Sequence, residues 1–149
     1  MRDEQYIREA ITLAEQAVEN GNTPFGSLLV VDDEVVRRSR NTTRTDDDIT
    51  AHPELKLARW AARELSATER ADCTMYTSTE PCEMCATAIH YAELDRVVFS
   101  VSTSAFAELR GNDSHGFTCK ELIDAKGGST TVEGPVLEAE GLQVHEQFY

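Results

Sequence analysis

Two short segments of the sequence carry side chains that could bind a metal ion and move protons. One covers residues 52–54 (HPE), and the other covers residues 81–85 (PCEMC). Because Cys82 and Cys85 lie three positions apart, one helical turn can aim both sulfurs at the same point, and a helix N-terminus favours the thiolate form. With the imidazole of His52 they make three protein ligands for zinc, which leaves a fourth position for water, as in a catalytic site.

Glu54 lies two residues beyond the predicted histidine ligand. Its carboxylate can stay free of the metal and still collect a proton from the bound water, which zinc makes acidic. The same group can return the proton to a ring nitrogen and to a leaving amine. The combination of H-x-E with P-C-x-x-C is typical of zinc enzymes that replace an exocyclic amino group by a carbonyl and release ammonia. We therefore predict Glu54 as the general acid and base.

Other interpretations of these residues stay open. A lone C-x-x-C pair can be a redox site, and a zinc ion can be purely structural. A structural site needs a fourth ligand in suitable spacing, whereas His90, His115 and His145 each stand alone. The two remaining cysteines, at positions 73 and 119, are expected to be buried small hydrophobic residues.

The charge and hydrophobicity of the chain limit which kinds of molecule it is expected to bind. The chain has 149 residues, 27 of them acidic and 14 basic, for a net charge of −13. Such a charge repels phosphate backbones, so a nucleic-acid partner is not expected. No apolar stretch is long enough to cross a membrane, and charged residues follow Met1. We expect one soluble, cytoplasmic domain over residues 1–149.

Hydrophobic spacing predicts the elements that carry these residues. A helix is expected from Tyr6 to Val18, a hairpin from residues 26–31 and 34–38, and a loop over residues 41–50. A second helix runs from about His52 to Leu65, with proline tolerated in its first turn.

The second half of the chain predicts a β-α-β unit. Residues 73–78 form a strand, 83–92 a helix and 96–101 a second strand, which favours parallel strands. A helix near residues 118–125, a strand near 131–136 and a C-terminal helix or tail complete the prediction.

Nearly the whole chain resembles the cytidine deaminase superfamily, in its branch of purine-base and tRNA-adenosine deaminases. Residues 22–26 (NTPFG), 48–52 (DITAH) and 76–89 (YTSTEPCEMCATAI) are similar to segments of that branch. The resemblance implies an α/β fold, a three-layer α/β/α sandwich around a mixed five-stranded sheet. It also implies a homodimer, in which C-terminal segments can be exchanged.

The resemblance also implies substrate contacts. Asn41 matches a base-binding asparagine, and Phe25 can stack on a base. Asp113 and the C-terminal Tyr149 are similar to an aspartate and an aromatic residue that guanine deaminases place around the purine. One departure is Pro53, where family members commonly have alanine or glycine with a backbone N–H. We expect its absence to alter substrate selectivity.

These observations favour zinc-dependent deamination of a small aminopurine or related aminoheterocycle, similar to guanine or guanosine. A tRNA adenosine-to-inosine deaminase and a cytosine or cytidine deaminase are the alternative enzymes. An inert, zinc-stabilised binding module is the alternative outside catalysis.

Overall fold

A mixed five-stranded sheet forms the middle of the protein in the computed structural model, which describes residues 2–149. The spatial order of the strands is β2-β1-β3-β4-β5, with β1 antiparallel to both neighbours and β3, β4 and β5 parallel. The strands are β1 (Gly26–Val31), β2 (Glu34–Arg40), β3 (Cys73–Thr79), β4 (Arg96–Val101) and β5 (Thr131–Glu133).

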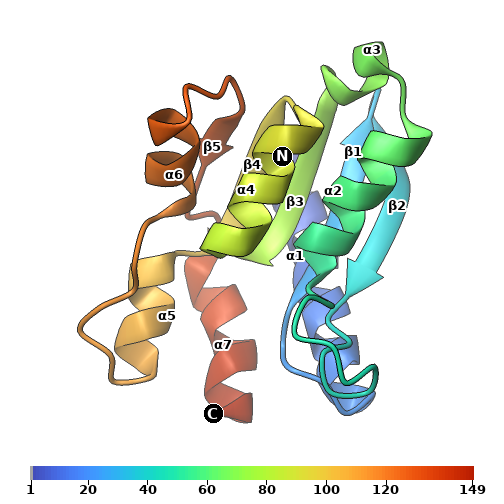
Figure 1. Cartoon of the computed structure of the whole chain (residues 1–149). Coiled ribbons are helices and arrows are strands. Elements are labelled where there is room, and N and C mark those ends of the chain that lie inside the picture. The colour runs from blue at the N-terminus through green and yellow to red at the C-terminus, as the bar shows by residue number, and fades with distance from the viewer. Residues whose placement is uncertain (1) are drawn as a thin grey trace.

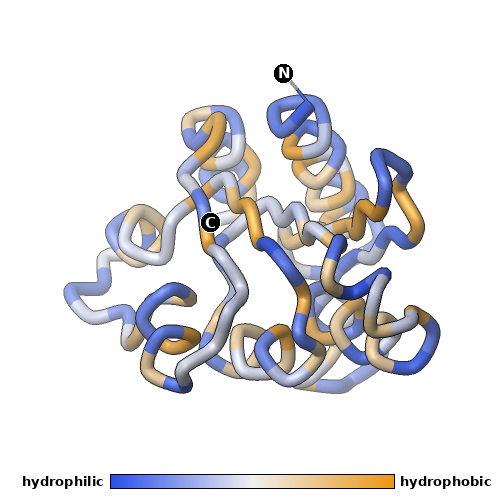
Figure 2. The backbone as a smooth tube through the Cα atoms, turned by 90° about the horizontal axis from the view of Figure 1, so that it is seen from above, coloured by the Kyte–Doolittle hydropathy of each residue, from blue (hydrophilic) through white to orange (hydrophobic). Residues whose placement is uncertain are grey.

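Helices cover both faces of this sheet (Figures 1 and 2). Helices α1 (Arg2–Glu19) and α7 (Glu138–Phe148) pack on one face, and α2 (Pro53–Glu64) and α4 (Glu83–Ala92) pack on the other. Three shorter helices lie around them: α3 (Ala67–Arg70), α5 (Thr103–Leu109) and α6 (Cys119–Ala125). The predicted α/β/α sandwich with a mixed five-stranded sheet is confirmed.

Alternation along the strands divides the core in two, because successive side chains of a strand point to opposite faces. Leu28 and Val30 of β1 face α1, whereas Leu29 between them faces α2 and α4. Gly26 lets α1 approach the sheet closely, since a Cβ there would lie 2.5 Å from the backbone nitrogen of Ala14. The N-terminal helix therefore packs directly against the start of β1, beside the segment that carries Phe25.

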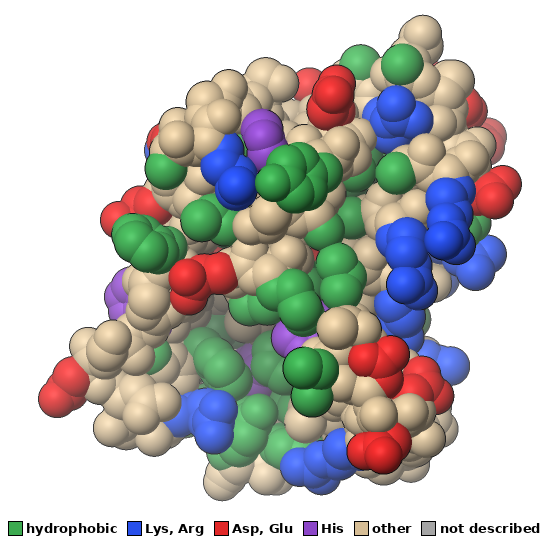
Figure 3. Space-filling view, in the orientation of Figure 1, with side chains coloured by type: hydrophobic (Ala, Val, Ile, Leu, Met, Phe, Trp, Pro, Cys, Tyr) green, Lys and Arg blue, Asp and Glu red, His purple; other side chains and the backbone are tan. Residues whose placement is uncertain are grey.

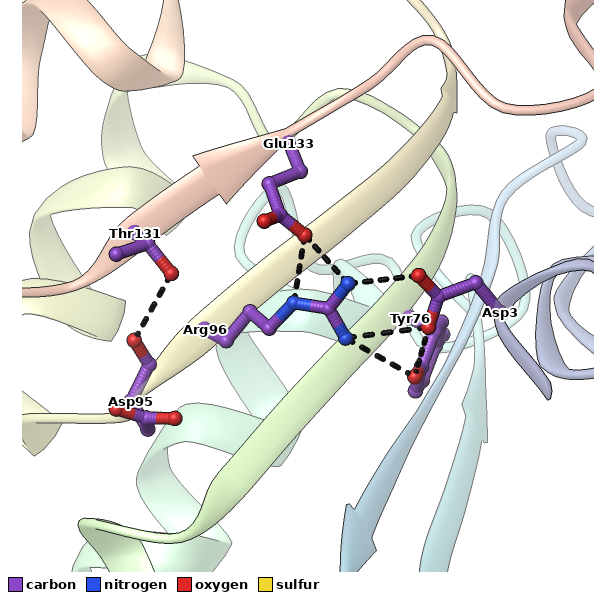
Figure 4. A network of polar contacts seen from close by, with 6 residues as sticks. All are labelled: Asp3, Tyr76, Asp95, Arg96, Thr131 and Glu133. Carbon is purple, nitrogen blue, oxygen red and sulfur yellow. Dashed lines mark hydrogen bonds and ion pairs between the residues drawn. The ribbon is translucent and has the colours of Figure 1, made fainter. Parts of the chain in front are cut away.

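An ion-pair network links three strands to α1 where β4 begins (Figure 4). Arg96 donates to both carboxylate oxygens of Asp3, at 3.1 and 2.7 Å, and to Glu133 at 2.6 Å. The phenol of Tyr76 donates to Asp3 at 2.6 Å. Every charge in this network has a partner, and the arginine holds the pKa of Asp3 below its usual value.

The main elements match the sequence prediction, including the hairpin, the β-α-β unit and the helix at the C-terminus. Asp32 and Asp33 make the hairpin turn with positive φ angles of 51° and 62°, as a two-residue type I′ turn requires. Two short helices, α3 and α5, were not predicted, and β5 is shorter than expected. Within residues 2–149, no helix has the length and apolar character needed to span a bilayer.

Candidate active site

The three predicted metal ligands meet at the N-termini of α2 and α4. His52 precedes the first residue of α2, and Cys82 precedes the first residue of α4, with Cys85 on its first turn. The Nδ1 atom of His52 lies 3.6 Å from the Cys82 sulfur and 3.5 Å from the Cys85 sulfur. All three ligand atoms lie within 4.8 Å of one another.

These distances fit a tetrahedral zinc ion. A nitrogen ligand at about 2.0 Å and a sulfur ligand at about 2.3 Å from one tetrahedral ion stand about 3.5 Å apart. Contact with the Cys85 thiol lowers the pKa of Cys82 to about 4, so one thiolate is present near neutral pH. One imidazole and two cysteine sulfurs form a donor set that suits zinc, with a coordination position left for water.

Glu54 lies beside this cluster on the first turn of α2. Its side chain is buried, with 4% exposure, and Oε1 has no hydrogen-bond partner among residues 2–149. Burial, together with the nearby charge of Cys82, raises the pKa of Glu54 to about 7. A buried carboxylate oxygen without a partner is costly unless it serves a ligand or a reaction. Its position therefore matches the predicted role in proton transfer, which stays a prediction.

A cavity of about 350 Å³ opens onto the cluster. The space-filling view shows this hollow, with hydrophobic and histidine side chains inside it (Figure 3). Glu54, His52 and Cys82 lie in its wall, at the end of the sheet where β3 and β4 terminate. Crevices at the carboxyl ends of parallel strands are the usual ligand sites of α/β proteins. The cavity has the volume of a small-molecule site.

Two of the four predicted substrate contacts line this cavity. Asn41 is buried, and its Oδ1 accepts from the backbone N–H and the hydroxyl of Thr43, at 3.0 and 2.9 Å. Its oxygen is thus occupied, and the Nδ2 hydrogens are left to donate to a ligand. Phe25 packs edge-on against Phe106 with ring centroids 5.8 Å apart, which gives the cavity an aromatic wall.

The other two predicted contacts lie outside the cavity lining of this single chain. Asp113 is exposed in the loop between α5 and α6, although its neighbours Asn112 and Ser114 line the cavity. Tyr149 is 48% exposed and stacks near His145, with the guanidinium of Arg110 4.9 Å from its ring centroid. Roles for Asp113 and Tyr149 stay predictions from the resemblance.

A buried carboxylate missed by the sequence prediction shapes one wall of the cavity. Glu80 accepts from the backbone N–H of Thr103 through Oε1 and from that of Cys119 through Oε2, both at 2.8 Å. These two amides begin α5 and α6, so Glu80 holds both ends of the segment between them. That segment supplies Phe106, Arg110 and the loop to the cavity. The hydrogen-bond partners of Glu80 are distant from it in the sequence, so no local sequence pattern predicts them.

Comparison with known proteins identifies the family. Residues 1–101 match the model of the cytidine and deoxycytidylate deaminase zinc-binding region, which is more than half of the chain. The chain belongs to this family. The deaminase is therefore a hydrolytic enzyme of the cytidine deaminase superfamily, and its family is a zinc-binding one.

The relatives of this deaminase differ in their named substrates. It is 30% identical over 152 residues to a probable cytosine deaminase of Schizosaccharomyces pombe, covering 99% of this chain and 93% of that one. It is 37% identical over 123 residues to the guanine deaminase of Bacillus subtilis, covering 82% and 78%. A solved structure from work on A-to-I editing by tRNA:A34 deaminases superposes with a TM-score of 0.71 at 25% identity, covering 94% and 98%.

Proposed function

We propose that this deaminase removes the amino group of a small aminopurine, as the free base or its nucleoside, with guanine and guanosine as the reference substrates. The observation that carries the proposal is the buried, unpartnered carboxylate of Glu54 in the wall of a cavity that His52 and Cys82 also line, with Cys85 buried directly behind them within ligand distance. In this proposal His52, Cys82 and Cys85 hold zinc. Zinc, when bound, supplies the Lewis acidity that ionises water near neutral pH.

Different residues of the chain would transfer protons to the substrate ring and hold it in place. Glu54 would take the proton from water at its free Oε1, deliver it to a ring nitrogen and then to the departing amine. Water and the amino substrate thereby become the carbonyl product and ammonia. Asn41 would donate from Nδ2 to an acceptor on the base, and Phe25 would lie against the ring.

Several features favour a small aminopurine over a polynucleotide. The B. subtilis guanine deaminase is among the relatives, at 37% identity. The net charge of −13 disfavours phosphate backbones. A tRNA substrate is nevertheless a second candidate, because basic side chains gather over α2 and β2 (Figure 3) and a tRNA:A34 deaminase structure is similar.

An ammonia-release screen tests the substrate. The panel contains guanine, guanosine, adenine, adenosine, cytosine, cytidine, triazine-type amines and a tRNA anticodon stem-loop. We expect the highest kcat/KM with guanine or guanosine. Turnover of the stem-loop that falls steeply with salt, without turnover of any free base, would instead favour the tRNA enzyme.

The resemblance also leads us to propose a homodimer that can exchange C-terminal segments. Such an exchange would bring a second copy of Tyr149 toward the cavity. Light scattering on the purified protein, with and without the last helix, tests this proposal. A monomer at all concentrations would contradict it.

A further inference from the structure

A buried histidine lies directly behind the wall of the cavity. His145 on α7 is 1% exposed, and its Nε2 lies 2.7 Å from Oγ1 of Thr79, a residue of the cavity wall. Its ring also packs against Phe25 and Phe106, with centroid distances of 5.3 and 4.7 Å. His145 therefore contacts three cavity-lining residues, although it is not part of the lining itself.

The surroundings of His145 decide which ring nitrogen carries the hydrogen. Its Nδ1 has no hydrogen-bond partner among residues 2–149. Burial lowers the pKa of His145 to about 4, so the ring is neutral near pH 7 and carries one N–H. A buried N–H without an acceptor is rarer in proteins than an acceptor without a donor. The hydrogen therefore belongs on Nε2, which donates to Thr79.

This tautomer leaves the hydroxyl hydrogen of Thr79 free. A hydroxyl that accepts one hydrogen bond still has its own hydrogen to donate. In the part of the chain that the structure describes, His145 is the one side-chain partner of Thr79 Oγ1. No backbone acceptor is bonded to this hydroxyl among residues 2–149 either, and Thr79 lines the cavity, so a ligand in the cavity can accept the hydroxyl hydrogen.

We propose that Thr79 donates this hydrogen to an acceptor on the substrate ring, and that His145 is the positioning residue that orients the hydroxyl. The acceptor would be a carbonyl oxygen or an unprotonated ring nitrogen. This inference rests on the proposed function and narrows it, because it selects aminoheterocycles with an acceptor at the edge that faces the end of β3. It also adds a donor to a site in which Pro53 offers no backbone N–H.

Substitutions at both positions test the pair against a merely structural role. Thr79→Val removes the hydroxyl at nearly constant volume, Thr79→Ser keeps it, and Thr12→Val on α1 controls for the chemical change. We expect Thr79→Val to lower kcat/KM about tenfold, the loss of one hydrogen bond to substrate. Thr79→Ser should recover most of the activity that Thr79→Val loses, Thr12→Val should stay within about twofold of wild type, and zinc content should be the same in all.

His145 variants show whether the histidine acts through Thr79. His145→Phe keeps a ring in the aromatic cluster but cannot donate, whereas His145→Gln keeps a donor near the Nε2 position. We expect a loss of about threefold to tenfold for His145→Phe and a smaller loss for His145→Gln. The double variant Thr79→Val/His145→Phe should be no worse than Thr79→Val alone, because both changes remove one interaction.

The outcomes separate this inference from the proposed function. A wild-type protein that turns over no aminoheterocycle in the panel overturns both. Wild-type turnover with equal kcat/KM for Thr79→Val overturns the inference alone. Additive losses in the double variant overturn the positioning role of His145. If His145→Phe does not fold, Thr79→Val and Thr79→Ser still test the hydrogen bond from Thr79. Both variants are then also assayed on a deaza analogue of the substrate that lacks the acceptor. The tenfold difference in kcat/KM between them should disappear with this analogue.

Discussion

The two ends of the central sheet differ in whether their polar side chains have hydrogen-bond partners. Where β4 begins, Arg96, Asp3 and Glu133 pair with one another, and Tyr76 completes the network (Figure 4). At the other end, Glu54 Oε1 and His145 Nδ1 are buried without partners among the described residues. Polar groups with hydrogen-bond partners stabilise a fold, whereas buried polar groups without partners are typical of ligand-binding and catalytic sites. From this difference we infer that the Arg96 network mainly stabilises the fold, and that the end with Glu54 and His145 mainly serves binding and catalysis.

Loss of a predicted zinc ligand should have the largest effect. We expect Cys85→Ser to abolish stoichiometric zinc binding, as measured by elemental analysis, and to lower the deamination rate by at least about 10³-fold. Because a metal would join Cys85 on α4 to His52 at the start of α2, the melting temperature should fall as well. Cys73 is a buried thiol of the core, and Cys73→Ala should keep both zinc and rate. Equal zinc content in Cys85→Ser would remove this cysteine from the metal site.

Replacement of Glu80 should loosen the cavity wall without releasing metal. In Glu80→Gln the amide nitrogen faces a backbone N–H and cannot accept from it, so one of two buried amides loses its partner. We expect KM to rise about tenfold and the free energy of unfolding to fall by about 1–3 kcal/mol. Glu108→Gln, an exposed change on α5, is the matched control. An unchanged KM would show that the anchoring of α5 and α6 does not shape the substrate site.

The buried imidazole of His145 should make stability depend on pH. Its pKa is about 4 in the folded protein, compared with 6.5 for a free histidine. As pH falls below 6.5, the unfolded chain takes up the proton first, so the neutral ring's contribution to stability is full above 6.5 and is lost toward pH 4. The calculated loss between about pH 7.5 and about pH 5 is roughly 2 kcal/mol. The neighbours of the ring are Phe25, Phe106 and Tyr149.

Denaturant unfolding of the wild type and His145→Phe at both pH values isolates this contribution. The stability difference between the two proteins should shift by that amount in favour of the variant as the pH falls. A difference that is independent of pH would mean that the imidazole is not buried as described.

The smallest effect is expected at the paired end of the sheet. Arg96→Met should reduce the free energy of unfolding by about 1–2 kcal/mol, because the network is partly exposed and solvent screens it. Both kcat and KM should match the wild type. A changed KM would show that the Arg96 network also affects substrate binding, which contradicts the inferred difference between the two ends of the sheet.

Much of the fold was predictable because its signals are local. Alternating or helical spacing of apolar residues predicted α1, the hairpin, α2, β3, α4 and β4. The missed helix α3 also had a local signal, since Ser66 and Glu69 form a capping box. The strand order β2-β1-β3-β4-β5 was not predictable from spacing, because it depends on which edges pair in space.

The site was predictable only in part for the same reason. His52, Glu54, Cys82 and Cys85 stand in two short motifs, and the structure brings them together. The partners of Glu80 and His145 lie 23 to 66 positions away in the sequence. Sequence reasoning treated His145 as an isolated histidine, and only the folded chain puts it behind the cavity wall.

The most direct test of the account compares zinc content and turnover in Glu54→Gln and the wild type. Gln keeps the size of the side chain but cannot carry the proton. We predict one zinc per chain in both proteins, an unchanged fold, and a rate of ammonia release about 10²–10⁴-fold lower in the variant. Wild-type turnover by Glu54→Gln, or a wild-type protein that binds no zinc, would contradict the account.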